Sequence, residues 1–130
     1  MELIHIPMSP GELLDKITIL EIKSERMDDP AKLANVRTEL DLLNATWRDA
    51  VNADDTVTRL HAELKSINEA LWEIEDDIRD KERAKEFDDR FIELARAVYV
   101  TNDKRAAAKK ELNTYLGSTI VEEKSYQDYT

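Results

Sequence analysis

The sequence contains no cysteine, two glycines, three prolines and few aromatic residues. The absence of cysteine excludes a disulfide framework, thiol catalysis and metal ligation by thiolates. No apolar run approaches the roughly 18 residues of a membrane span, and the N-terminus lacks the basic and apolar regions of a secretory signal. We therefore expect a cytoplasmic protein that does not insert into membranes.

Basic residues are also scarce relative to acidic ones: 19 against 29, for a net charge of -10. This balance argues against binding to nucleic acid or anionic lipid, because that affinity comes from Lys and Arg neutralising phosphates. The charge is unevenly distributed. Residues 69–93 hold eleven acids and five bases, whereas residues 96–110 hold five bases and one acid.

The few glycines and prolines lie near the ends of the chain, so nothing from residue 31 to residue 116 breaks a helix. Apolar residues across this region recur in steps of three and four, which is typical of long helices packed at a shallow angle. We predict an all-α fold, an antiparallel bundle of about four helices in a single domain of residues 1–130. Two long, coiled-coil-like helices and short extended termini complete the prediction.

The first helix opens on a capping box, in which Ser9 caps, Pro10 takes the first helical position and Glu12 reaches back to the Ser9 N–H. It runs to about Met27. Its apolar residues spread beyond one stripe, so we expect its own bundle and a partner subunit to cover it. The other helices are expected at about residues 31–51, 56–83 and 88–117.

The ends of the chain are short and β-branched. The N-terminal segment (residues 3–8) and residues 118–121 are expected either to pair as a two-stranded ribbon or to clamp a neighbouring subunit. Residues 118–130 are expected to form an extended C-terminal arm.

Four carboxylates of the third helix, at i, i+4, i+7 and i+11, share one face. Like charges at these spacings destabilise a helix unless something offsets them. One interpretation is a network of ion pairs between helices, and the other is a Mg²⁺ site, because hard cations prefer oxygen ligands. The four residues are Glu69, Glu73, Asp76 and Asp80.

In the fourth helix, Thr101 and Arg105 take positions where apolar residues belong. An Arg that faces the interior needs an acid or an anionic ligand. Either Arg105 forms a buried salt bridge with Asp15 or Glu21, or it belongs to an anion pocket. That pocket would consist of Arg96, Tyr99, Asn102 and Arg105.

Charged residues are also embedded in the apolar first helix, so some of them must border the core. We expect a structural polar network there, together with an i,i+4 pair on the third helix. Its members are Asp15, Lys16, Glu21, Arg26, Glu75 and Arg79.

Three parts of the sequence together resemble an uncharacterised family of small bacterial proteins. They are residues 9–26 followed by 32–36, residues 72–79, and residues 91–99 with 102–105 and 123–126. The family's members are catalogued as a domain of unknown function, and some are encoded near glycosyltransferases of surface-polysaccharide synthesis. The resemblance implies an intact single-domain protein and assigns no catalytic residues.

Two weaker likenesses concern enzymes. The first helix, which ends at Arg26, is similar to the opening helix of all-helical chorismate mutases. Those enzymes hold a dicarboxylate with Arg and Lys residues, and the resemblance implies that Arg26, Arg96, Arg105 and Lys109 would do so here. All-helical nucleotide pyrophosphohydrolases bind Mg²⁺ through paired acidic motifs, which residues 69–82 do not reproduce.

From the sequence we expect a non-catalytic interaction or assembly protein, a cytoplasmic homodimer with a possible further protein partner. No cofactor is expected, apart from a possible Mg²⁺. The alternative is a small-anion-binding module or enzyme that uses the Arg-rich pocket between helices.

Overall fold

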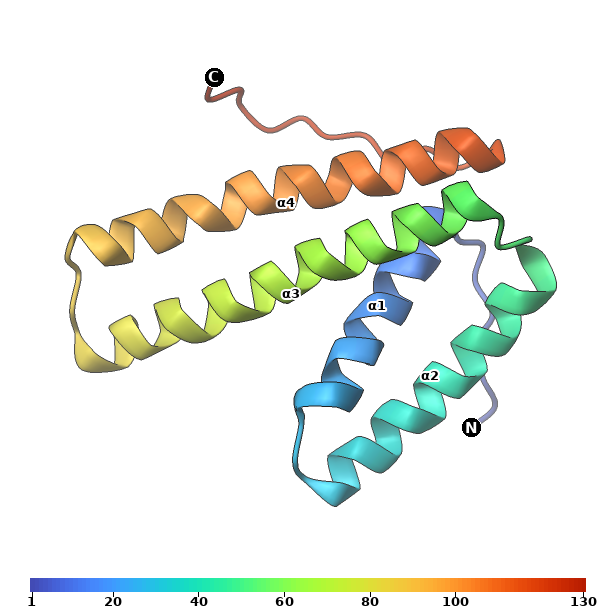
Figure 1. The fold of residues 1–130 in the computed structure, drawn as a ribbon, viewed down its shortest axis with the longest axis horizontal. Helices are drawn as coiled ribbons and strands as arrows, with labels where there is room; N and C mark the ends of the chain where they lie inside the picture. Colours follow the sequence, from blue (N-terminus) through green and yellow to red (C-terminus); the bar gives the residue numbers. More distant parts are fainter.

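The computed structural model describes residues 1–130 and is all-helical, with four helices and no strand. The helices are α1 (Pro10–Arg26), α2 (Pro30–Ala50), α3 (Asp55–Ala84) and α4 (Asp89–Leu116), shown in Figure 1. The predicted all-α class and the number of helices are confirmed, and each boundary lies within a residue of the predicted one. None of these helices combines the length and apolarity needed to cross a membrane.

Side-chain caps explain why the helices begin where they do. Ser9 Oγ accepts a hydrogen bond from the Glu12 N–H at 3.2 Å, and Asp29, Asp54 and Asp88 cap the later helices in the same way. The α3–α4 turn has no glycine, and Lys85 adopts the left-handed conformation there, with φ of 57°. The reciprocal half of the predicted capping box is absent, because the Glu12 carboxylate bonds to Lys109 instead.

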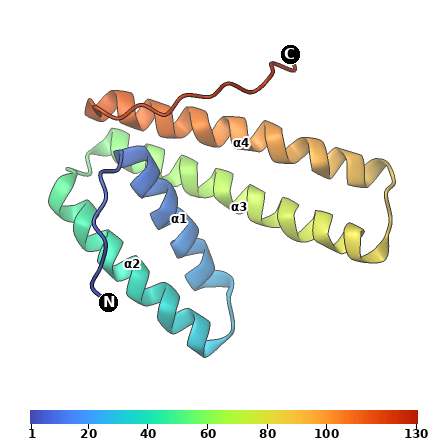
Figure 2. The ribbon, with the colours of Figure 1, turned by 180° about the vertical axis from the view of Figure 1, so that it is seen from behind.

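The helices form two hairpins, α1–α2 and α3–α4, and α1 packs the first hairpin against the second (Figures 1 and 2). In both views α3 and α4 lie side by side, and their far halves extend beyond α1. Helix α1 contacts all three other helices, whereas α2 packs against α1 alone. The wide apolar surface of α1 is therefore covered within one chain, so it is not evidence for a partner subunit.

The main core lies where α1, α3 and α4 meet. Leu14, Ile17, Leu60, Leu64 and Leu112 are each 1% exposed or less. Trp47 from α2 joins the same cluster. These residues occupy the three–four periodicity of the sequence, so the apolar pattern determines which helix faces point inward.

The ends are extended but unpaired, and the predicted two-stranded ribbon is wrong. The N-terminal segment leads into α1, while the C-terminal arm folds back along α4 (Figures 1 and 2). The two ends therefore have different surroundings. The arm contacts α4 through its side chains, and the backbone of residues 1–8 makes no backbone–backbone hydrogen bond.

Gly11 brings the start of α1 directly against α4. Its N–H donates to Asn113 Oδ1 at 2.7 Å. A Cβ at this position would lie 2.6 Å from the Lys109 carbonyl oxygen and 2.8 Å from Asn113 Oδ1. Because the first of these atoms is backbone, it cannot move aside without shifting α4.

We expect Gly11→Ala to destabilise the protein by about 1–3 kcal/mol, the usual cost of overpacking a tight contact. The matched control is Gly117→Asn: Gly117 has nothing within 4 Å of its Cβ position, and Asn tolerates its left-handed backbone. Urea denaturation measures the free energy of unfolding of both variants. Equal midpoints for Gly11→Ala and the unaltered protein would show that α1 does not abut α4.

Candidate functional site

A buried polar cluster joins α1 to α3 and α4. The Asp15 carboxylate is its centre: the residue is 3% exposed and accepts a hydrogen bond from Asn68 Nδ2 of α3 at 2.9 Å. The Nε of Arg105 on α4 lies 3.7 Å from the same oxygen. Asn68 also donates to Thr18 Oγ1 at 2.9 Å. One carboxylate thus links three helices.

Further contacts between α1 and α3 continue this line toward the end of α1. His61 Nε2 lies 2.7 Å from Glu21 Oε1, and Lys65 contacts Glu25 at 2.9 Å. The pKa of Lys65 is raised, mainly by its hydrogen bond to Glu25. These are contacts at a half-buried boundary, where ion pairs contribute modestly to stability and chiefly align the helices.

The structure gives each member of the expected polar network a partner. Of the two acids considered for Arg105, Asp15 is the one that it meets, whereas Glu21 meets His61. Lys16 contacts Glu39 of α2 at 3.0 Å, and Glu75 contacts Arg79 at 3.1 Å. Arg26 contacts Glu69 and Glu73, and its guanidinium lies 6.0 Å from the centre of the Trp72 ring.

The carboxylates considered for Mg²⁺ do not converge on one point. Glu69 and Glu73 face Arg26, Asp80 contacts Arg83, and Asp76 borders a different hollow. No group of three or more acidic or histidine side chains is arranged to hold a metal. Arginine offsets much of the repulsion on this helix face, so the structure gives the magnesium hypothesis no support.

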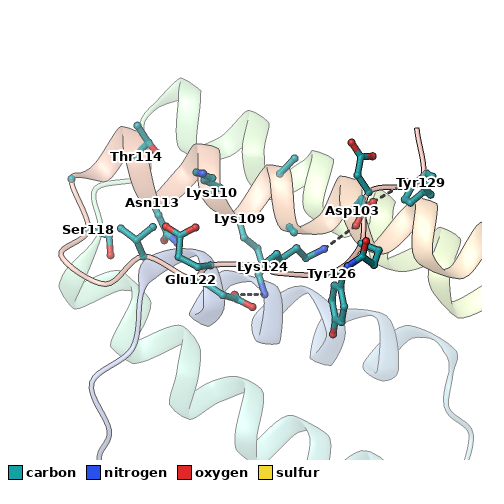
Figure 3. A pocket seen from close by; sticks show the side chains of 17 residues that line it. Asp103, Lys109, Lys110, Asn113, Thr114, Ser118, Glu122, Lys124, Tyr126 and Tyr129 are labelled. Carbon is teal, nitrogen blue, oxygen red and sulfur yellow. Dashed lines mark hydrogen bonds and ion pairs between the residues drawn. The ribbon is translucent and has the colours of Figure 1, made fainter.

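The C-terminal arm runs back along α4 and forms two adjoining hollows with it, the first of which is shown in Figure 3. The first, of about 720 Å³, is lined by Lys109, Lys110 and Asn113 of α4 and by arm residues including Tyr126 and Tyr129. The second, of about 660 Å³, shares Lys109 with the first and reaches Tyr99. Together they form what we call the arm groove.

Side chains hold the arm in place. Lys124 Nζ and the Tyr129 hydroxyl both donate to the Asp103 carboxylate, at 2.9 and 2.8 Å. The Tyr129 ring also meets the Tyr99 ring edge-on, with centroids 5.1 Å apart. The hydrogen bond from Lys124, followed by that from Tyr129, lowers the pKa of Asp103.

Lys109 is the most buried cation of the arm groove, at 7% exposure. Its Nζ lies 2.9 Å from Glu12 of α1 and 3.3 Å from Glu122 of the arm. Burial lowers the pKa of Lys109, but the hydrogen bond to Glu12 and nearby carboxylates outweigh it, so the pKa is raised. Lys109 therefore carries a positive charge at neutral pH, between a carboxylate of α1 and a carboxylate of the arm.

Three of the four residues expected to bind an anion line one hollow. Tyr99, Asn102 and Arg105 border the second hollow together with Lys109, whereas Arg96 lies outside it. Asn102 and Arg105 also border a third hollow of about 460 Å³, next to Trp72 and Arg79. The structure therefore brings this set together except for Arg96.

Sequence reasoning missed several residues of this region. Asn68 is buried one turn from both Leu64 and Leu71, and its place within that apolar series was a signal that could have revealed it. Asn113, Glu12 and Glu122 gave no such signal, because Asn113 and Glu12 have partners about 100 residues away and Glu122 meets its partner, Lys109, only when the arm folds back on α4.

These features define a small all-helical protein with a polar groove between its last helix and its C-terminal arm. The chain belongs to DUF6165, a family of unknown function, whose family model matches residues 4–129. No curated protein and no solved structure matches the chain.

We predict that acid releases the arm from α4. The pKa of Asp103 is lowered in the docked arm, so this contact contributes fully above the usual Asp pKa of about 3.9 and is lost as the pH falls through the lowered value. NMR signals of the Tyr129 ring should report the loss. Asp103→Asn should remove the pH dependence, and an identical titration in that variant would contradict the assignment.

Proposed function

We propose that the protein is a non-catalytic interaction protein that works as a homodimer in the cytoplasm. The observation that carries this proposal is the N-terminal segment. Leu3, Ile4 and Ile6 are 65%, 73% and 63% exposed. Water therefore surrounds three large aliphatic side chains on an extended stretch of chain with no backbone pairing.

An exposed extended segment of this kind is suited to pairing with another chain. Its free N–H and C=O groups provide the hydrogen bonds of a strand, and its side chains provide apolar area. A second copy offers the same segment, so a two-fold axis would bring two self-complementary surfaces together. The arm does not compete for this role, because it lies on α4.

The number of exposed hydrophobic residues, compared with the number buried, also supports assembly. The chain buries thirteen hydrophobic residues and leaves fifteen large ones exposed, including Phe87 and Ile92 near the α3–α4 turn. Burying apolar surface yields about 25 cal/mol per Å². Contact between two chains would therefore stabilise the assembly by burying apolar side chains that are exposed in the single chain.

We expect light scattering at micromolar concentration to give the mass of a dimer. Replacing Ile4 and Ile6 together by Asp should yield a monomer with unchanged helical circular dichroism, because neither side chain belongs to the core. Leu42→Asp, on the exposed face of α2, is the matched control and should remain dimeric. A compact monomer of the unaltered protein would refute the proposal.

A second candidate function, small-anion binding, is supported by the lining of the arm groove. Tyr99, Asn102 and Arg105 share a hollow with the ammonium of Lys109. Arg105 has only Asp15 within ion-pair distance, at 3.7 Å, which leaves guanidinium donors for a carboxylate or phosphate. An enzyme acting on such an anion, mutase-like or hydrolase-like, would use the same groups.

If this second function is correct, a dicarboxylate or a sugar nucleotide should raise the melting temperature, and Arg105→Ala should abolish the rise. Arg96→Ala is the matched control: it removes the same charge from the same helix outside the hollow, so the rise should persist. Thermal shift with a panel of anions measures both, and the absence of any rise in the unaltered protein would exclude the function.

A further inference from the structure

We propose that the arm groove is a binding site for an extended acidic peptide, and that the arm occupies it in the resting protein. The proposal goes beyond dimerisation, because it concerns a different end of the chain and a different surface. Its basis is that one carboxylate on the buried Lys109 comes from the arm.

The two carboxylates on Lys109 differ in how firmly they are held. Glu12 stands in the first turn of α1, which Gly11 fixes against α4 through its hydrogen bond to Asn113. Glu122 belongs to the arm, and its side chain is 60% exposed. An incoming carboxylate can therefore replace Glu122 while Glu12 stays in place.

The attachment of the arm favours this exchange. Residues 119–130 make no backbone–backbone hydrogen bond, so their hold on the body consists of side-chain contacts to Lys109, Asp103 and Tyr99. Exposed contacts of this kind are individually weak. Yet the hollows beside the arm, about 720 and 660 Å³, leave room along its whole path.

The chemistry of the site specifies the class of ligand. A buried ammonium requires an anionic partner, and Arg105 and Lys110 add positive charge to the groove. The contacts of the arm extend from Glu122 to Tyr129, so the groove accommodates an extended chain with an acidic residue at one end and an aromatic one at the other. The arm sequence itself is the model for such a peptide.

The test uses the full chain and a fluorescein-labelled peptide with the sequence of residues 122–130, followed by anisotropy. The tethered arm competes at high effective concentration, so the unaltered protein should bind the peptide weakly. In Glu122→Gln the tethered arm loses its contact with Lys109, and the peptide should bind about fivefold more tightly. Glu122 lies outside the core, so the substitution preserves folding.

Three controls decide the outcome. A peptide with Gln in place of its first residue should bind about fivefold more weakly to Glu122→Gln. Lys104→Ala, which removes a lysine of α4 outside both hollows, should leave binding of the original peptide unchanged. Equal peptide binding to Glu122→Gln and the unaltered protein would overturn the proposal. Displacement of the peptide by an equal concentration of succinate would also overturn it, because the ligand would then be a small carboxylate.

Discussion

The buried carboxylate of Asp15 is the interaction on which the rest of the structure depends. A carboxylate removed from water is costly unless hydrogen bonds and opposite charge compensate it, and here Asn68 of α3 and Arg105 of α4 do so. Both partners are within reach only when α1 packs against both longer helices in one register. Apolar packing supplies most of the stabilisation, but leucine and isoleucine faces tolerate sliding. The polar cluster therefore determines the register, and Gly11 adds a second constraint by allowing backbone contact with α4.

This register of α1 determines where the candidate functional residues lie. With α1 fixed, Glu12 reaches Lys109, and the ammonium of Lys109 faces the path of the C-terminal arm. The same arrangement leaves both ends of the chain outside the core, one apolar and one acidic. A closed body with two extended ends suits a protein that recognises partners, because the ends can change their contacts without disturbing α1, α3 and α4.

Local signals in the sequence predicted the helices well. Ser9, Asp88 and Gly117 mark boundaries by capping, and caps depend on neighbours a few residues away. Partners in space were harder to predict. The position of Arg105 on an apolar face required an acid, yet periodicity could not choose between Asp15 and Glu21, which lie nearly two turns apart on α1. The acidic face of α3 suggested a metal because the sequence does not show that Arg26 approaches it.

Amide hydrogen exchange of the unaltered protein at two concentrations tests the central claim most directly, namely that a closed helical body carries a free N-terminal segment for assembly. The account predicts slow exchange in the buried turns of α1, α3 and α4 at both concentrations. It predicts fast exchange of residues 3–8 in dilute solution and protection of the same residues when the protein is concentrated. Fast exchange of residues 3–8 at both concentrations would contradict the account.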